Sequence, residues 1–494
     1  MIDWLANHPW AILAAVVVAV VLGKVAYLIL LERKVASWVQ DRVGPNRVGP
    51  AGLLQPIADG LKMLVKEDYR PARTDRRLFT IAPAVIMVVA ILSIAVVPWG
   101  GWVRRTAKVD VTGPEPRIVE TYAGVPALSP PLAFFRQIPD QEQKRAEAEA
   151  AKVIPSNAVL DFAVSWSGQP DTLKVTTVGV TYRWPFQIAS LDIGVLFVIA
   201  VLSLGVYGVV VGGWASNNKY SFLGGLRAAA QMISYEIPLG LALLCIVVMY
   251  GTLDLGELVQ KQAHSWLGIV PAWNAFAQPL AFVLFLVCIH AEANRLPFDL
   301  AECEQELVGG YHTEYSSMRF GFFLLAEYAA MITTSAVCVA LFFGGWHFPG
   351  LTGSVDPANP AVTDSIWIAI LRSGVFFAKT MLVIFVFMWV RWSLPRFRFD
   401  QLMLMAWRGM IPLSLAALLA TAIVVWAFGP RRANMQVGGT MALVLLAVNV
   451  ALLAVAMLIS RLLPAPPPTN RRIVVQGSRF ASATRAIATM DRRA

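Results

Sequence analysis

Residues His290–Gly321 read HAEANRLPFDLAECEQELVGGYHTEYSSMRFG and separate two long apolar runs. The stretch carries six carboxylates, whereas almost everything around it is apolar. Several close carboxylates cannot all ionise cheaply, so some are expected to hold protons and to titrate as a coupled set. The stretch therefore predicts a proton-handling loop between two membrane-spanning segments. Its acids are Glu292, Asp299, Glu302, Glu304, Glu306 and Glu314, with Glu327 just beyond.

The composition is that of a polytopic membrane protein. The 494 residues are 57% hydrophobic and 15% charged, against a charged fraction of about a quarter in soluble domains. Backbone groups cannot stay unpaired in lipid, so apolar runs of roughly 20 residues should be helices. The predicted fold is all-α, with about nine transmembrane helices and with cytoplasmic amphipathic and acidic loops. The expected spans are Trp10–Leu31, Phe79–Val97, Leu191–Val211, Ala228–Tyr250, Trp273–Ala291, Phe320–Phe343, Ile366–Trp389, Met410–Phe428 and Val437–Leu463.

The distribution of basic residues predicts the orientation. Lys and Arg crowd the loop after the first span and the C-terminal tail, whereas the loops after the fourth and sixth spans hold only Lys261. By the positive-inside rule, the N-terminus is expected outside and the C-terminus in the cytoplasm, with the acidic stretch also on the cytoplasmic side. The net charge of +10 then reflects membrane orientation rather than binding to nucleic acid.

Four regions are expected along the chain. Residues 1–98 hold the first two spans and a cytoplasmic loop, and residues 99–190 form an outer insertion with the charged, helix-like run QEQKRAEAEAAK. Residues 191–463 hold the other spans and the acidic loop, and residues 464–494 form a basic cytoplasmic tail. No internal repeat is evident.

The four cysteines are isolated from one another and from histidines. This spacing predicts neither a zinc site nor an iron–sulfur cluster held by this chain alone. An electron carrier is therefore expected in a partner or as a diffusible substrate. The cysteines are Cys245, Cys288, Cys303 and Cys338.

The loop Glu32–Asp68 contains a second signal. Gly44-Pro45 and Gly49-Pro50 interrupt any helix, and apolar residues then recur at helical spacing from Leu53 to Val65. This pattern predicts a short amphipathic helix at the membrane boundary. The helix is either a plain anchor or the entrance by which an apolar substrate passes from the bilayer towards charged residues.

Ionisable residues also occur inside the expected spans. An Asp or Lys at mid-membrane costs about 2.5–3.5 kcal/mol, so such groups usually face a polar interior. One interpretation is that these residues form structural ion pairs. The other is that they store and pass protons, which is favoured because acids outnumber bases once the acidic loop is included. The residues are Lys24, Glu236, Glu327 and Lys379, with Glu292 at the end of the fifth span.

The conformation of the acidic stretch is open from sequence alone. Pro297 disfavours helix at Leu296 and should end the fifth span there. Glu302 and Glu306 would share a face and repel in a helix, whereas an extended loop projects alternate acids to one side. A plain solvated loop is the simpler alternative. A further basic loop, Trp389–Gly409, either balances these acids or positions a partner.

Long ordered motifs in these segments resemble a known family. GLLQPIADGLKMLVKED in the first loop and PFDLAECEQELVGGYHTEY in the acidic loop are similar to two signatures of the quinone-site membrane subunit of respiratory NADH:quinone oxidoreductase, complex I. Leu204–Glu236 and Leu394–Met403 resemble its internal segments. The similarity extends to about Phe428, whereas the outer insertion and the tail depart from the family.

The resemblance implies the membrane side of a quinone chamber, coupled to proton translocation. Quinone is then the substrate, no catalytic redox group or metal is expected on this chain, and flavin and iron–sulfur clusters belong to partner subunits of the peripheral arm. Small and antiporter-like membrane subunits are the other implied partners, in a bacterial inner membrane. Carried over by motif, Arg33, Asp59, Arg396 and Arg398 border the quinone tunnel, and Glu236, Glu292, Asp299, Glu302, Glu304, Glu306, Glu314 and Glu327 form the proton path.

Two alternatives stay open at this point. A homologous membrane anchor of a hydrogenase, or of a dehydrogenase that does not use NADH, would share the acidic loop. A stand-alone ion transporter would also embed acids in its spans.

Overall fold

The computed structural model describes most of the chain and divides it into two compact units, Met1–Val450 and Ala451–Ala494. The second unit is described only to residue 462, where its helix ends. The run QEQKRAEAEAAK, Cys303, Glu302 and the basic tail lie outside the described residues. The described ranges are 9–110, 117–123, 161–167, 174–266, 270–301, 304–352, 362–363, 366–428 and 437–462.

The described chain is mainly helical, as predicted for an all-α polytopic membrane protein. Each expected span coincides with a helix, and seven helical segments within the described ranges are long and apolar enough to cross a membrane. The long helices are α2 (Pro9–Val39), α4 (Arg76–Ile94), α6 (Gly194–Ala215), α7 (Lys219–Tyr250), α10 (Pro279–Glu292), α12 (Ser317–Phe342), α13 (Ile366–Ser393), α15 (Ile411–Phe428) and α16 (Gly439–Leu462).

Short elements join the long helices. The predicted amphipathic helix is present as α3, which follows a turn of 3-10 helix, and α14 runs through a π-helical turn into α15. These elements are η1 (Pro50–Gly52), α3 (Gln55–Val65), α8 (Leu255–Lys261), α9 (Asn274–Ala277), α11 (Glu304–Leu307), η3 (Gly310–His312), α14 (Phe399–Leu404), η4 (Met405–Met410) and the β5–β6 hairpin (Ser265–Trp266 and Val270–Pro271).

Several helix boundaries differ from those expected, and three of the differences have a cause in the sequence. α2 continues to Val39, eight residues beyond its expected end at Leu31, because no Gly or Pro interrupts the chain before Gly44. α10 ends at Glu292, before Leu296, and Pro279 separates it from the single turn of α9. α7 begins earlier than expected, because the side chain of Asn218 accepts a hydrogen bond from the Tyr220 amide and caps the helix.

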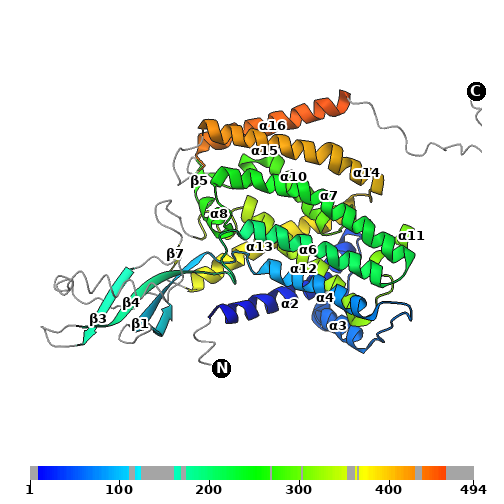
Figure 1. The fold of residues 1–494 in the computed structure, drawn as a ribbon, viewed down its shortest axis with the longest axis horizontal. Coiled ribbons are helices and arrows are strands. Elements are labelled where there is room, and N and C mark those ends of the chain that lie inside the picture. The colour runs from blue at the N-terminus through cyan, green and yellow to red at the C-terminus, as the bar shows by residue number, and fades with distance from the viewer. Residues whose placement is uncertain are drawn as a thin grey trace, which may run out of the picture. The chain divides into compact units, whose positions relative to one another are not determined.

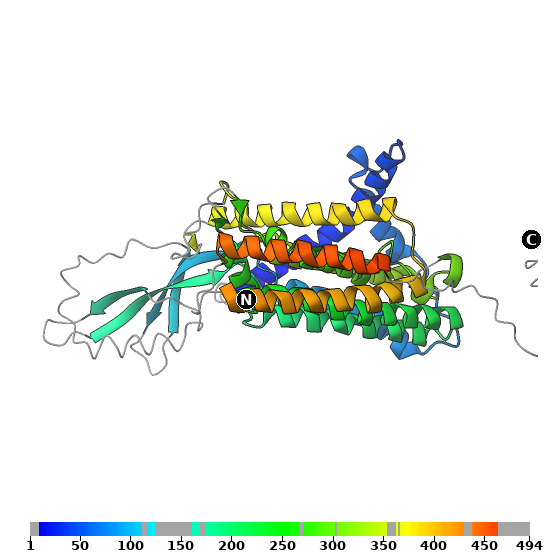
Figure 2. The same cartoon turned by 90° about the horizontal axis from the view of Figure 1, so that it is seen from above.

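Helix α12 forms much of the interior. It contacts α2, α4, α10 and α13, and most of its apolar window is buried. Two of its threonine hydroxyls are satisfied within the helix, since Thr333 and Thr334 donate to the Ala329 and Ala330 carbonyls at 3.0 Å. Figures 1 and 2 show α4, α6, α7, α13 and α15 running roughly parallel around this interior.

The sequence analysis did not predict the strands in the insertion after α4. Four strands form an antiparallel sheet in the order β2-β1-β4-β3, and the short strand β7 adds to β1 in parallel. β-branched residues in the stretch KVTTVGVTYRWP suit the longest of these strands. The strands are β1 (Trp102–Asp110), β2 (Arg117–Ala123), β3 (Asp161–Ser167), β4 (Lys174–Pro185) and β7 (Val362–Thr363).

Candidate functional site

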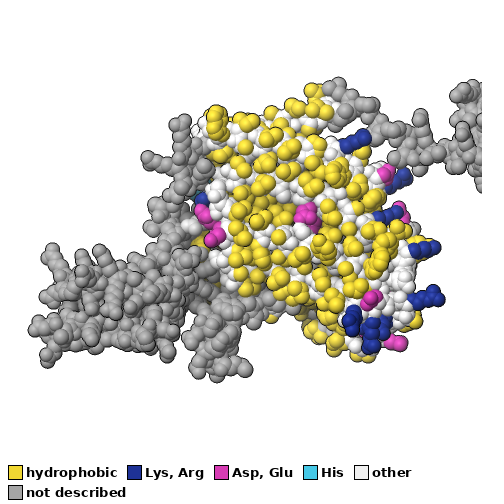
Figure 3. Space-filling model, in the orientation of Figure 1, with side chains coloured by type: hydrophobic (Ala, Val, Ile, Leu, Met, Phe, Trp, Pro, Cys, Tyr) yellow, Lys and Arg dark blue, Asp and Glu magenta, His cyan; other side chains and the backbone are white. Residues whose placement is uncertain are grey.

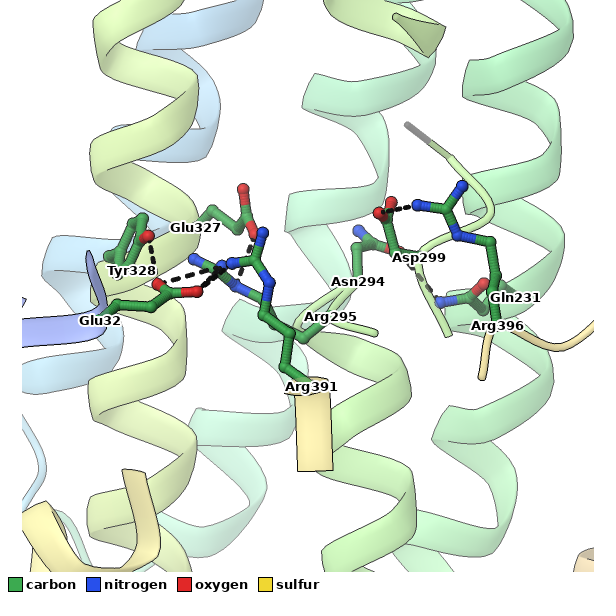
Figure 4. Close-up of polar contacts among 9 residues, drawn as sticks. All are labelled: Glu32, Gln231, Asn294, Arg295, Asp299, Glu327, Tyr328, Arg391 and Arg396. Atoms are coloured by element: carbon green, nitrogen blue, oxygen red, sulfur yellow. Dashed lines mark hydrogen bonds and ion pairs between the residues drawn. The ribbon is translucent and has the colours of Figure 1, made fainter. Parts of the chain in front are cut away.

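Glu32 lies on α2, in the segment that the sequence analysis assigned to a loop. Its side chain is only 7% exposed. The Tyr328 hydroxyl of α12 donates to Glu32 Oε2 at 2.5 Å, and Arg391 of α13 forms an ion pair with Oε1. Arg295, from the loop after α10, lies 3.4 Å from Oε1. Three helices and one loop therefore converge on a single buried carboxylate (Figure 4).

Arg295 joins this carboxylate to a second one. Its Nε atom lies 2.8 Å from Glu327 Oε1, and its guanidinium plane lies 4.1 Å from the centre of the Tyr328 ring. We call Glu32, Arg295, Glu327, Tyr328 and Arg391 the buried ion cluster. Its two carboxylates and two guanidinium groups balance in charge, which is the condition under which buried charges are tolerated.

The loop after α10 is held so that Arg295 points into the cluster. Gln231 of α7 donates to the Ala291 carbonyl at 2.8 Å and to Asn294 Oδ1 at 3.1 Å. Asn294 has φ +48°, a left-handed conformation that Asn adopts more readily than most residues. The chain therefore turns immediately before Arg295, and the segment that leads into this turn is anchored to α7 by Gln231.

A second ion pair anchors the same loop further along. Asp299 Oδ2 lies 2.9 Å from Arg396 Nη2, and the Phe397 amide donates to the Pro297 carbonyl at 3.2 Å. Both charged side chains are largely buried. The pair therefore ties the start of the acidic stretch to the segment between α13 and α14 (Figure 4).

We expect this pair to contribute to stability. In a double-mutant cycle with Arg396→Gln and Asp299→Asn, the coupling energy should be about 1–2 kcal/mol, between the values of exposed pairs and buried charged hydrogen bonds. The measurement is the midpoint temperature at which the purified complex loses activity. Additive effects of the two changes would mean that the pair contributes nothing.

Two adjoining cavities lie beside the buried ion cluster. A pocket of about 240 Å³ between α2, α3 and α12 is lined mainly by apolar residues such as Leu30, Met63 and Leu325. A cavity of about 480 Å³ is lined by Glu32, Tyr328 and Arg391. Ile29, Arg33 and Leu324 line both, so the two spaces share a wall.

Arg33 and Asp59 meet where these cavities adjoin. Arg33 Nη1 lies 2.9 Å from Asp59 Oδ2, and Gln55 donates to Asp59 Oδ1 at 3.1 Å. Asp59 lines the apolar pocket. Arg396 and Arg398, the other two residues predicted at the quinone tunnel, are not among the residues that line either cavity. Arg396 pairs with Asp299, and Arg398 is exposed at the start of α14.

Three of the predicted proton-path residues lie in the helix interior. Glu292 and Glu327 line a cavity of about 60 Å³ between α4, α6, α7, α10 and α12. The charge of Glu236 on α7 acts on Glu292, and Ser203 of α6 donates to Glu236. The charges of Asp299, Arg391 and Glu32 act on Glu327. Glu236 is thus linked electrostatically to Glu292, and Glu327 to the buried ion cluster, while the small cavity lies between Glu292 and Glu327.

The other predicted acids lie apart from these interior carboxylates. Glu306 is half exposed and pairs with Arg227 at 2.5 Å, and Glu314 accepts from Asn218 at 2.6 Å. Glu304 begins the single turn α11, so the extended alternative for residues 304–306 is wrong. Burial lowers the pKa of His312 to about 4, so its ring is neutral at pH 7 and adds no positive charge to this stretch.

Three members of the buried ion cluster, Glu32, Arg295 and Tyr328, were not predicted from the sequence, and one other was recognised incompletely. Glu32 and Arg295 were passed over because each stands just outside an expected span, where a charge is ordinary. Arg391 was noted only as part of a basic loop, and one of the roles left open for it, the balancing of acids, holds for Glu32. The signal that could have found them is the pair of opposite charges at the ends of two neighbouring apolar runs.

Comparison with known proteins identifies the family. The sequence pattern of the NADH dehydrogenase family matches residues 12–119 and 162–422. The H subunit of the Flavobacterium johnsoniae NADH-quinone oxidoreductase is 39% identical over 415 residues, which are 84% of this chain and 94% of the relative. The H subunit of the Leptospira biflexa enzyme is 38% identical over 431 residues, 86% and 98% of the two chains. Subunit 8 of the Rhodothermus marinus NADH-quinone oxidoreductase is 36% identical over 418 residues, 85% and 97%.

The fold and the buried ion cluster define a multi-pass membrane protein that keeps balanced charges between its helices beside an apolar pocket. With these matches, the chain belongs to the NADH dehydrogenase family and is a membrane subunit of NADH-quinone oxidoreductase. The resemblance seen in the sequence is thereby confirmed. Its partners are other subunits of that oxidoreductase, which disfavours both the hydrogenase anchor and the stand-alone transporter. Among the described residues, no cluster of His, Cys, Asp and Glu is suited to hold a metal ion.

Proposed function

We propose that this subunit forms the membrane side of the quinone chamber and couples quinone reduction to proton translocation through its carboxylates. One observation carries the proposal. An apolar pocket at the membrane boundary shares a wall with a polar cavity, and that cavity ends on the buried ion cluster. A quinone needs this combination, because its isoprenoid tail is apolar and its headgroup carries oxygen acceptors.

The entrance is the apolar pocket beneath α3. The apolar side chains of α3 face away from the protein, with Ile57, Leu61 and Leu64 each more than half exposed. Such a face lies in the boundary between headgroups and acyl chains. Quinone in the bilayer would pass between α3 and α2, reach the pair Arg33–Asp59 and then enter the polar cavity.

A quinone analogue should therefore label this pathway. We expect a photoreactive quinone in the assembled complex to crosslink to residues of α2, α3 and α12 around Asp59. Asp59→Asn, which leaves Arg33 without its anionic partner, should raise the KM for quinone roughly fivefold, a loss of about 1 kcal/mol of binding. Asp68→Asn is the control, since Asp68 pairs with Arg319 away from the pocket. Labelling confined to other helices would refute the entrance.

Coupling would begin at Glu32. A change of charge in the polar cavity acts directly on this carboxylate, which forms ion pairs with Arg391 and Arg295. Arg295 is also bound to Glu327, so any shift of its guanidinium towards one carboxylate weakens its hold on the other. Glu327 would then exchange a proton with Glu292 across the small cavity between them, which is large enough for water. Glu236 continues the series towards a neighbouring subunit.

The roles of the remaining predicted residues are part of the same proposal. Asp299 and Arg396 would hold the acidic stretch in register with the cluster. Glu306 and Glu314, together with Glu302 and Glu304, would link the stretch to adjoining subunits at the membrane surface, and Arg398 would border the chamber from its exposed position. Flavin and iron–sulfur clusters in partner subunits would supply the electrons.

The proposed orientation follows the surface charge. On the described surface, Lys and Arg gather at one end of the helices, where α3, α11 and α14 lie, and the lateral face is largely apolar (Figures 1 and 3). That basic end would face the cytoplasm of a bacterial inner membrane. The N-terminus and the insertion 99–190 would then be periplasmic, and the tail 464–494 cytoplasmic.

A further inference from the structure

A separate groove runs along the other side of α2. It has a volume of about 410 Å³ and lies between α2 and α13, with Ile332 of α12 as its floor. Leu28 and Leu31 form one wall, and Phe377 and Ile384 form the other. The groove exists because α2 runs obliquely to α13, so that the two helices separate along part of their length (Figure 2). Neither Glu32 nor Asp59 lines it.

The groove is open to the membrane. Tyr27 and Leu53 on its rim are 46% and 51% exposed. Leu53 stands just before α3, the amphipathic helix at the membrane boundary. This end of the groove therefore lies at the level of that boundary. The groove therefore extends from the boundary into the apolar layer.

The charged groups of the groove are all cationic. Lys24 lies over the ring of Phe377, and Lys34 donates to the Ala51 carbonyl at 2.5 Å. Within the described ranges, no carboxylate forms an ion pair with either lysine. The two residues are ten positions apart on one helix, about 15 Å, and leave two positive charges along an otherwise apolar wall. A cation held inside the membrane without an anion is costly, so the groove is complementary to an anionic amphiphile.

The width of the groove decides the kind of occupant. A further helix in the groove would need about 8–10 Å between its axis and the axis of each neighbouring helix. That space is not free, because Lys24 of α2 already contacts the Phe377 ring of α13. A further transmembrane helix cannot fit between two helices that already touch. A flexible acyl chain can.

We propose that the groove binds an anionic phospholipid. Its phosphate would lie against Lys34 at the membrane boundary, and one acyl chain would lie between α2 and α13. Lys24 lies about 15 Å from Lys34 along α2 with its ammonium group over the Phe377 ring, so it would add positive charge to the apolar part of the groove without contacting the phosphate. Such a lipid would also bridge the helices that carry Glu32 and Arg391, so it would support the buried ion cluster from outside.

The test uses the whole complex in nanodiscs of phosphatidylcholine that contain a small, equal fraction of one photoreactive lipid. The two probes carry the photoreactive group on the acyl chain and differ only in the headgroup, phosphatidylglycerol or phosphatidylcholine. A basic residue at the membrane surface favours anionic lipid by about 1 kcal/mol, which is roughly fivefold. We therefore expect the phosphatidylglycerol probe to label groove residues of α2 and α13 at least about fivefold more than the phosphatidylcholine probe.

Charge variants make the test specific. Lys34→Gln should reduce anionic labelling of the groove by about fivefold and Lys34→Arg should retain it, with Lys66→Gln, just after α3, as the matched control. The amount of intact complex on native gels verifies that each complex is assembled. Equal labelling by both probes, or undiminished labelling in Lys34→Gln, would overturn the proposal. Loss of the label when a short-chain quinone analogue is added would overturn it too, because the occupant would then be a quinone.

Discussion

Replacement of Arg295 by Met is expected to be the most damaging single change in this protein. It leaves Glu32 and Glu327 as two buried carboxylates with only Arg391 to balance them. Removing one partner of a buried ion pair typically costs about 3–5 kcal/mol, because the remaining charge stays desolvated. We expect little assembled complex in the membrane and no measurable quinone reduction from it. The measurements are the amount of intact complex on native gels and its NADH:quinone activity.

A second substitution separates charge from shape. In the double variant Arg295→Met, Glu327→Gln, one acid and one base are lost together, so Glu32 and Arg391 remain a balanced pair. We expect assembly to recover substantially in this variant, although coupling would still fail because Glu327 no longer ionises. Arg295→Lys should be intermediate, since one ammonium group cannot hold two carboxylates as the guanidinium fork does. If the double variant assembles no better than Arg295→Met, the charge-balance explanation is wrong.

The helices could be predicted from the sequence because lipid imposes a simple rule. An apolar run long enough to cross the bilayer must be helical, and each expected span coincides with a helix. The rule does not say where a helix stops once it leaves the lipid. α2 extends past Leu31 to Val39, and this extension places Glu32 and Arg33 on adjacent positions of a rigid helix. Strand pairing in the insertion was also out of reach, because it joins segments distant in sequence.

The candidate site was predictable only in part, for a related reason. Charges inside a span are conspicuous, so Glu236, Glu292 and Glu327 could be singled out. Charges at the ends of spans are common, and whether they are buried depends on which helices cross there. Arg295 and Arg391 are 96 positions apart in the chain, yet both reach Glu32. That meeting depends on the turn at Asn294 and on the contacts of α2 with α12 and α13, which no local pattern encodes.

The arrangement of charges implies a division of labour among the acids. The series from Glu32 through Glu327 and Glu292 to Glu236 lies between helices, where the low dielectric makes each charge sensitive to its neighbours. Glu306 on α11 and Glu314 after η3 instead pair with groups near the start of α7 that are themselves partly exposed. Exposed pairs are weakly coupled to anything distant, because solvent and salt screen them. Loss of a proton site should therefore matter in the first group and little in the second.

Glu292→Gln and Glu236→Gln are accordingly expected to impair quinone reduction and proton translocation together without preventing assembly of the complex. Glutamine keeps the size and hydrogen-bonding capacity of each side chain but cannot take up or release a proton at neutral pH. Proton-transfer groups typically contribute about 100-fold or more to a rate, and water in the adjoining cavity can bypass part of that. We expect quinone-linked turnover and proton translocation to fall by about tenfold to 100-fold in each variant. Both quantities can be measured on the complex reconstituted into sealed vesicles.

Glu306→Gln is the matched control, because it removes a carboxylate from the same acidic stretch. The Glu306 side chain is half exposed and forms an ion pair with Arg227. The turnover of this variant should stay within about twofold of the unaltered complex, as expected for a screened surface pair. NADH oxidation with a water-soluble acceptor should be unchanged in all three variants, since in the proposed arrangement that reaction does not pass through this subunit. Normal turnover and normal translocation in both Glu292→Gln and Glu236→Gln would remove the interior carboxylates from the coupling route. A loss in Glu306→Gln as large as theirs would instead mean that the whole acidic stretch acts together.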